Sequence, residues 1–384
     1  MHTFILAFLV SVLVTLLIVR YQHLHEHLSG DHDNDGVQKF HQGSIPRIGG
    51  VGIALGMIAV AVMLYVLRPA VAESFALLLL ASTPAFFGGL VEDFTKRVGV
   101  LPRLLLTMLA ALLGFWLLGA LLSRSDVELV DAFLAISGMG LLITAMTVAG
   151  VANAVNIIDG FNGLASMVSV MILGAMGYVA YVLGDHLLWN VCIASVGAIL
   201  GFFVWNYPRG LIFLGDGGAY LIGFLIGEVS VLLVARHAEV SPWFPLLLVI
   251  YPVFETLFSI YRRKVLQGVS PGRPDGLHLH TLIFRRLVRW ATGDLGHLRT
   301  RQNSATSPYL WLLCSASVFP ALLFWRNTEA LMACIVGFMA LYVWLYWRIV
   351  RFRTPKLMVK RERLNGGAGA VRNGPRPGSQ KPEE

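Results

Sequence analysis

The sequence has few charged residues and few cysteines for a chain of 384 residues. Charged side chains make up 14% of it and hydrophobic ones 56%, whereas a soluble domain has about 25% and about 45–50%. The cysteines lie inside apolar runs without paired spacing, which argues against disulfide bonds and thiolate-bound metals. They are Cys192, Cys314 and Cys334. This composition predicts a polytopic membrane protein.

Long apolar runs recur along the chain, and inside a bilayer helices satisfy every backbone hydrogen-bonding group. We therefore predict an all-α membrane protein with about 10–11 transmembrane helices over residues 1–350. The basic, glycine- and proline-rich tail, 351–384, has few apolar residues and is predicted to be disordered. The predicted spans are 3–20, 48–67, 74–91, 101–122, 130–150, 163–183, 188–205, 218–235, 243–261, 307–325 and 330–350.

Basic residues are distributed unevenly between the two sides of these spans. The odd-numbered connections and the tail carry most of them, whereas the even-numbered connections carry single arginines: Arg68, Arg124, Arg236 and Arg326. Because basic loops stay in the cytoplasm, we predict an external N-terminus, with the tail and all long polar loops in the cytoplasm. Membrane orientation accounts for the net charge of +8 without nucleic-acid binding.

Residues 147–164 carry polar side chains at the end of an apolar run. Asn153, Asn156 and Asp159 are three residues apart, so on a helix they fall within an arc of about 120°. Such a face can serve as a polar contact between helices. Polar groups at a membrane boundary are also costly to desolvate and often mark a functional site.

Two further loops place acids at the ends of apolar runs. Glu92 and Asp93 are adjacent, with Lys96 one turn further on, which is typical of an exposed helix end with a local ion pair. At a membrane edge the same pair can bind a cation or have shifted proton affinities. Asp216 lies between glycines before an apolar helix, where it can cap the helix or hold a metal beside a bound phosphate.

Cationic side chains lie in two other loops on the same predicted side. Lys39 and His41 precede the sequence IPRIGG, and cations there can meet an anionic ligand. The later loop carries His278, His280, Arg285 and Arg286. This set suits phosphate better than a metal because arginine binds phosphate in a fork. A basic loop on anionic lipid is an alternative for the arginines.

Together these loops join acids, amides and cations on one membrane face. Acids with arginines indicate an anionic, metal-bound ligand such as a nucleoside diphosphate, and the membrane indicates a lipid as the second substrate. A transporter would instead place its ionisable groups near the bilayer midplane. A transporter and a non-catalytic lipid-binding protein are the alternatives to an enzyme.

Five motifs occur in order: KFHQGSIPRIGG, VEDFTK, NAVNIIDGFNG, IFLGDGGAYLIG and HLHTLIFRR. In combination they resemble the bacterial polyprenyl-phosphate N-acetylhexosamine-1-phosphate transferases, of the glycosyltransferase family 4 type. The resemblance covers residues 1–350, and the last two motifs look most like the branch that initiates O-antigen, lipopolysaccharide or capsule chains. It implies a multi-pass protein of the bacterial inner membrane with its active site facing the cytoplasm.

The resemblance implies transfer of an N-acetylhexosamine-1-phosphate from a UDP-sugar to undecaprenyl phosphate, with release of UMP. Mg²⁺ is the implied cofactor, with Mn²⁺ as an alternative. Membrane lipid and a second copy of the chain in a homodimer are the other expected partners. The sequence leaves the sugar and the glycan pathway open.

The motif match also implies roles for single residues. Asp216 and Asn156 are expected to bind the metal. The expected catalytic residues are Asp93, as base or nucleophile near the lipid phosphate, together with Glu92, Asp159 and Asp216. Relatives carry aspartate in place of Glu92. The expected substrate-binding residues are Asp33, Lys39, His41, Lys96, Asn153, Asn156, His278, His280, Arg285 and Arg286.

Overall fold

The structure is a computed structural model that describes residues 1–24, 30–31, 45–268, 276–288 and 299–351. Its described part contains ten helices long and apolar enough to cross a membrane, which confirms the predicted all-α polytopic fold. The sheet found in this part is an antiparallel pair of two-residue strands, β1 (Gly30–Asp31) and β2 (Ile45–Pro46).

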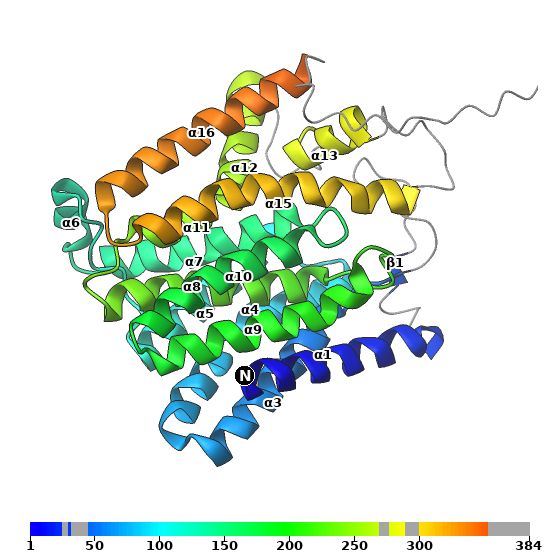
Figure 1. Cartoon of the computed structure of the whole chain (residues 1–384), viewed down its shortest axis with the longest axis horizontal. Coiled ribbons are helices and arrows are strands. Elements are labelled where there is room, and N and C mark those ends of the chain that lie inside the picture. The colour runs from blue at the N-terminus through cyan, green and yellow to red at the C-terminus, as the bar shows by residue number, and fades with distance from the viewer. Residues whose placement is uncertain (25–29, 32–44, 269–275, 289–298, 352–384) are drawn as a thin grey trace, which may run out of the picture.

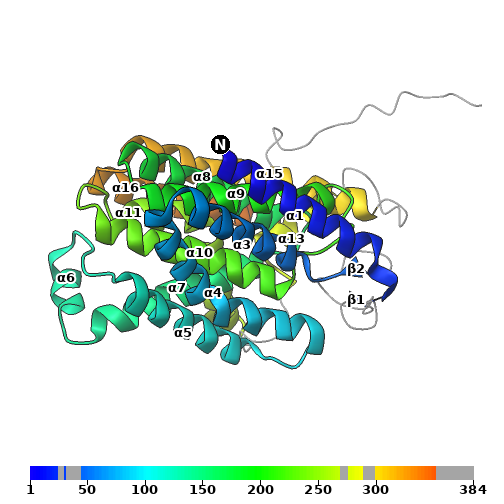
Figure 2. The same ribbon diagram turned by 90° about the horizontal axis from the view of Figure 1, so that it is seen from below.

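Figures 1 and 2 show the arrangement of the helices. In chain order they are α1 (His2–Arg20), α3 (Gly49–Leu67), α4 (Pro69–Thr95), α5 (Val100–Leu118), α6 (Glu128–Leu134), α7 (Met139–Ile158), α8 (Leu164–Val182), α9 (His186–Asn206), α10 (Gly215–Arg236), α11 (Trp243–Leu248), α12 (Ile250–Tyr261), α13 (Leu279–Ile283), α15 (Arg299–Phe324) and α16 (Thr328–Val350). Two π-helical turns, η1 (Arg262–Leu266) and η2 (Phe284–Val288), extend α12 and α13.

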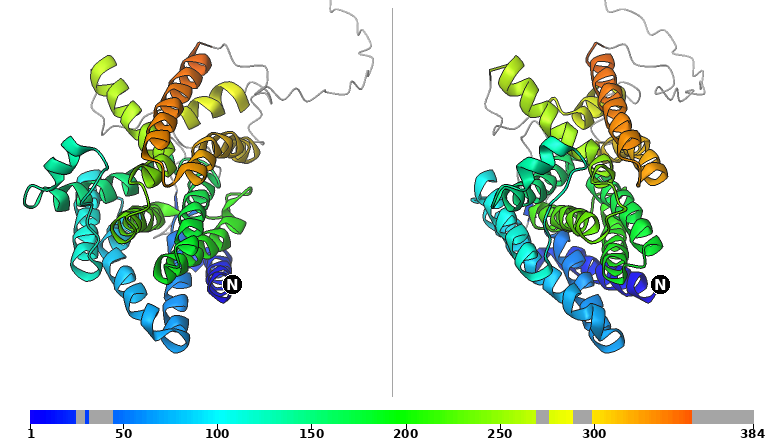
Figure 3. Two further views of the ribbon diagram at one scale, coloured as in Figure 1. Left: turned by 60° about the vertical axis from the view of Figure 1, so that its left-hand side comes forward. Right: turned by 90° about the vertical axis from the view of Figure 1, so that its left-hand side faces the viewer.

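Helix α10 forms the centre of the bundle and packs against α3, α4, α5, α7, α8 and α9 (Figure 3). Its residues are buried almost throughout because the helix is apolar on every side. A Cβ atom on Gly223 would lie 2.4 Å from the Cα of Ala152, and one on Gly227 would lie 3.0 Å from the Cα of Val148. These glycines therefore let α7 and α10 approach closely, as small residues do in membrane bundles.

Two predicted spans differ from the structure. The span 243–261 is broken into α11 and α12, because Pro252 has no N–H to donate to the carbonyl one turn earlier. In Figure 1, α12 runs across α15 and α16 instead of along them. The span 130–150 starts too early, since the chain breaks at Gly138, where φ is 78°, and α7 runs from Met139 to Ile158.

The two ends of the bundle carry different loops. The start of α1 meets the α3–α4 and α8–α9 connections at one end, which we call the distal face. Helix α16 ends at the other, where Arg286 donates to the carbonyls of Ile349 and Val350. We call this end the site face, because it also holds the start of α10 and the ends of α4 and α7. Thus α1 begins and α16 ends on opposite faces, as the charge pattern predicts.

Candidate active site

Asp216 is the centre of a polar cluster at the start of α10. It is the second residue of the helix, after Gly215, and its side chain makes no cap to its own helix. Its Oδ1 accepts a hydrogen bond of 3.0 Å from Nδ2 of Asn156 and lies 3.8 Å from Nη2 of Arg47. Arg103 forms an ion pair with its Oδ2. The capping alternative for Asp216 is therefore wrong.

The cap of α10 comes from Asp93, near the end of α4. Its Oδ1 accepts from the N–H of Asp216 at 2.8 Å, and its Oδ2 accepts from the N–H of Gly217 at 2.9 Å. A carboxylate is favoured there, because the first N–H groups of a helix lack partners and carry the positive end of its dipole. The close approach requires Gly89, where a Cβ atom would lie 2.5 Å from the Asp216 carbonyl.

The neighbouring acid, Glu92, has a different partner. Its Oε2 accepts from the N–H of Val98 at 2.6 Å and so closes the turn after α4. Lys96 is the C-cap residue of α4, is exposed and has a φ of 53°. The two adjacent acids therefore face separate groups, and only Asp93 reaches α10.

The polar face at the end of α7 joins this cluster. Asn153 and Asn156 lie in its last turns, and Asp159 is its C-cap residue. The Oδ1 of Asn153 accepts from the hydroxyl of Tyr220 at 3.3 Å, and the Arg103 guanidinium lies 5.6 Å from the centre of that ring. Burial raises the pKa of Asp159 to about 8, although the positive charge of Arg47 acts to lower it.

A second cluster is built around Glu255 of α12, which the sequence analysis missed. Its Oε1 accepts from the N–H of Leu279 at 2.7 Å and lies 3.3 Å from Nδ1 of His278 and 3.8 Å from Nδ1 of His280. The two imidazoles stack with centroids 5.0 Å apart. A lone acid inside an apolar span was the signal that could have identified Glu255.

The turn between α7 and α8 connects the two clusters. The ring of Phe161 meets the His280 ring edge-on, with centroids 5.6 Å apart. A Cβ atom on Gly160 would lie 3.5 Å from Nε2 of His280. The histidines therefore present their Nδ1 atoms to Glu255 and, for His280, the Nε2 atom to the turn that carries Asp159.

Other predicted site residues are placed differently. Arg286 contacts the C-terminal end of α16, where a cation stabilises the last carbonyls, and Arg285 is exposed. Arg47 lies within IPRIGG, where cations were expected to meet an anionic ligand, and it pairs with Asp216. Arg103, which also pairs with Asp216, was not among the predicted site residues. Asp33, Lys39 and His41 lie outside the described residues.

The donor types in the first cluster fit a hard divalent cation. Asp216 offers a carboxylate and Asn156 an amide oxygen, and Mg²⁺ commonly uses one or two such groups together with waters and substrate phosphates. Within the described ranges, no group of three or more histidine, cysteine or acidic residues could form a complete cage. The cluster therefore suits a cation that is bound together with a diphosphate.

Comparison with known proteins agrees with this geometry. Residues 75–234 match the model of glycosyl transferase family 4, a range that contains Asp93, Arg103, Asn156, Asp159 and Asp216. The chain is a polytopic membrane protein whose central part is similar to this family. This match and the relatives below support the family of polyprenyl-phosphate N-acetylhexosamine-1-phosphate transferases.

Relatives with related names cover different shares of the chain. An undecaprenyl-phosphate alpha-N-acetylglucosaminyl 1-phosphate transferase of Haemophilus influenzae is 29% identical over 347 residues, 86% of this chain and 91% of that protein. The probable undecaprenyl-phosphate N-acetylglucosaminyl 1-phosphate transferase of Bacillus subtilis is 26% identical over 72% of this chain and 76% of that protein. The match to the Thermotoga maritima transferase, 33% identical, spans 25% of this chain and 31% of the relative.

Proposed function

We propose that this protein transfers an N-acetylhexosamine-1-phosphate from a UDP-sugar to undecaprenyl phosphate and releases UMP, at the cytoplasmic face of a bacterial inner membrane. A phosphate oxygen of the lipid forms a bond to the β-phosphorus of the UDP-sugar, and the bond from that phosphorus to the oxygen retained by UMP breaks. The product would initiate a cell-surface glycan, such as an O-antigen or a capsule. The observation that carries the proposal is the cluster of Asp216 with Arg47, Arg103 and Asn156, held against Asp93.

The two arginines suit the diphosphate of the donor. A guanidinium donates in a fork that matches phosphate oxygens, and it stays charged at every physiological pH. Arg47 and Arg103 reach Asp216 from different parts of the chain, β2–α3 and α5. They could therefore hold a diphosphate from two directions while Asp216 keeps them oriented.

A divalent cation completes this proposal. Asp216 and Asn156 would hold Mg²⁺, or Mn²⁺, which would offset the negative charge of the diphosphate. Asp93 has both carboxylate oxygens on backbone N–H groups, so in this arrangement it positions Asp216 by fixing the start of α10. A role as base or nucleophile would require it to release those groups.

An apolar cavity supports a lipid as the acceptor. It has a volume of about 580 Å³ and lies along α7, α10, α11 and α12. Most of its lining is aliphatic, and Asn153 lines it close to the polar cluster. Part of a polyprenyl chain could occupy this cavity with its phosphate directed toward the site face, because the chain offers only apolar surface.

The experiment is an assay of purified full-length protein with undecaprenyl phosphate, Mg²⁺ or Mn²⁺ and a panel of UDP-N-acetylhexosamines. The proposal predicts UMP release that requires both the lipid phosphate and one of the UDP-sugars. Absence of lipid-dependent UMP release with every sugar would contradict it. A transporter is disfavoured because Asp93, Asp159 and Asp216 gather at one end of the bundle.

A further inference from the structure

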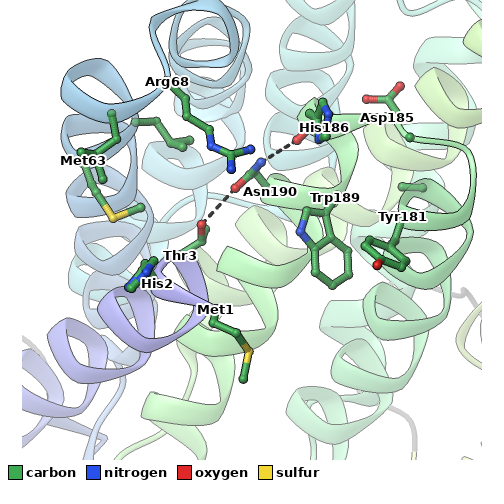
Figure 4. A pocket seen from close by; sticks show the side chains of 14 residues that line it. Met1, His2, Thr3, Met63, Arg68, Tyr181, Asp185, His186, Trp189 and Asn190 are labelled. Carbon is green, nitrogen blue, oxygen red and sulfur yellow. Dashed lines mark hydrogen bonds between the residues drawn. The ribbon is translucent and has the colours of Figure 1, made fainter.

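A second polar pocket opens on the distal face, at the end of the bundle opposite the cluster of Asp216. It has a volume of about 300 Å³ and is formed by the start of α1, the α3–α4 connection and the α8–α9 connection (Figure 4). The proposed reaction uses none of its residues. Its lining combines apolar side chains of α3 and α9 with Arg68, His2 and His186.

Arg68 differs from the other arginines of this face. Arg124 pairs with Asp126 at 2.7 Å, Arg236 with Asp185 at 2.7 Å, and Arg326 with Glu239 at 3.1 Å. For Arg68, the described part of the chain provides no acidic partner and no side-chain hydrogen bond. Its guanidinium points toward Asn190, inside the pocket, in Figure 4. Arg68 is exposed and lines the pocket, so its guanidinium is available to an anionic ligand.

The acid that lines the pocket does not neutralise Arg68. The Asp185 carboxylate is buried, with 1% of its side chain exposed. Its oxygens are occupied by the N–H of Leu188, by Arg236 and by His237 at 3.0 Å. The pocket therefore keeps the positive charge of Arg68.

The rest of the pocket suits an amphiphile at the membrane surface. The ring centroids of Tyr181 and Trp189 lie 5.2 Å apart, and tyrosine and tryptophan are enriched where hydrocarbon meets water. Met63 and Leu64 of α3 supply apolar surface in the same pocket. Thr3 and Asn190 hydrogen-bond to each other at 2.9 Å, which joins α1 to α9 behind the cavity.

We propose that this pocket is a binding site for a phosphate group, with Arg68 as its principal ligand and the headgroup of an anionic phospholipid as its source. Arg68 would bind the phosphate, and the apolar side chains of the pocket would contact the first part of the acyl chains. Free inorganic phosphate shares the headgroup chemistry but not the apolar contact. Binding of an anionic lipid at this site would stabilise the packing of α1, α3 and α9, so that packing would depend on the lipid composition of the membrane.

The test is native mass spectrometry of the purified full-length protein titrated with phosphatidylglycerol, phosphatidylcholine or inorganic phosphate. We expect phosphatidylglycerol to bind more tightly than phosphatidylcholine, and Arg68→Gln to weaken its binding about tenfold, as for the loss of one charge-assisted hydrogen bond. Arg68→Lys, which keeps the charge without the fork, should lie between the two. Arg326→Gln removes one arginine charge from the same face and should bind as the wild type does.

Three results would overturn the proposal. Phosphatidylglycerol could bind Arg68→Gln as tightly as the wild type, it could lose equal affinity in both arginine variants, or it could bind no better than phosphatidylcholine. Binding of inorganic phosphate as tight as that of phosphatidylglycerol would overturn the lipid as the source. Each variant is checked by lipid-dependent UMP release, which should be retained because neither Arg68 nor Arg326 lines the apolar cavity or contacts Asp216.

Discussion

Asp185 on the distal face and Asp216 on the site face have the same surroundings at first sight. Both are buried acids at the start of a helix, and both pair with arginine. Asp185 is the N-cap of α9 and accepts from the N–H of Leu188 at 3.0 Å. The start of α10 is capped by Asp93 instead of Asp216, so the Asp216 carboxylate is free to face Asn156 and the arginines. The comparison teaches that an acid becomes available for ligands when another residue caps its helix.

The largest expected effect comes from Asp216→Asn compared with Asp185→Ala. Asp216→Asn removes the charge that orients two arginines and binds the cation, so we expect UMP release to fall at least about 1,000-fold with folding retained. Asp185→Ala removes a cap and should cost about 1 kcal/mol of stability or more, with turnover intact. Turnover and thermal unfolding of both purified variants measure the contrast. Equal turnover in the two variants would contradict the distinction.

The next effect separates the adjacent acids of α4. Asp93→Asn replaces one of the two acceptor oxygens at the start of α10 by a donor, which faces an N–H group. We expect this to displace Asp216 and lower kcat about 100-fold or more, whereas Glu92→Gln keeps an acceptor for Val98 and should change kcat only a few-fold. UMP release at saturating lipid phosphate measures both. An inactive Glu92→Gln with an active Asp93→Asn would reverse the assignment.

A smaller effect is expected at the histidine cluster. Glu255→Gln keeps an acceptor for the N–H of Leu279 but loses the charge beside His278 and His280. We expect KM for the UDP-sugar to rise about tenfold, as for a lost charge-assisted contact, with less change in kcat. The matched control is Glu228→Gln, a buried acid of α10 outside both clusters, which should keep the wild-type KM. If Glu255→Gln also keeps the wild-type KM, the cluster does not position the donor.

The smallest expected effect is a pH dependence from Asp159. Because its pKa is raised from 3.8 to about 8, the folded protein holds this proton longer than the unfolded chain does. The stability that the neutral carboxyl contributes is present below pH values of about 4 and is lost as pH rises through about 8. The thermal unfolding temperature of the metal-free protein should therefore fall between pH 6 and pH 8 by about 1 °C or more beyond the fall seen for Asp159→Asn. If the unfolding temperatures of the wild type and Asp159→Asn change in parallel with pH, the pKa of Asp159 is not raised.

The sequence predicts the site where its residues follow one another on the same helix. The spacing of Asn153, Asn156 and Asp159 indicates one polar face, and the structure places the first two on the last turns of α7. The glycines of α10 predict close helix packing for a similar reason, since periodicity and residue size are local properties.

Partners between distant segments could not be predicted in this way. Arg103 meets Asp216 only because α5 and α10 pack side by side. Glu255 meets the histidines only because the span 243–261 breaks at Val249, three residues before Pro252, and redirects α12. Helix packing and a kink decide these contacts, and neither has a signature in residue spacing alone.

The most direct test of the central claim is to identify which nucleotide leaves. Purified protein is incubated with undecaprenyl phosphate, Mg²⁺ and the UDP-sugar that supports turnover, and the nucleotide and lipid products are measured by mass spectrometry. The account predicts UMP and a lipid-linked sugar diphosphate in equal amounts, and neither product with Asp216→Asn. Release of UDP with a lipid-linked sugar monophosphate would contradict it, because the bond broken would then lie between the sugar and its phosphate.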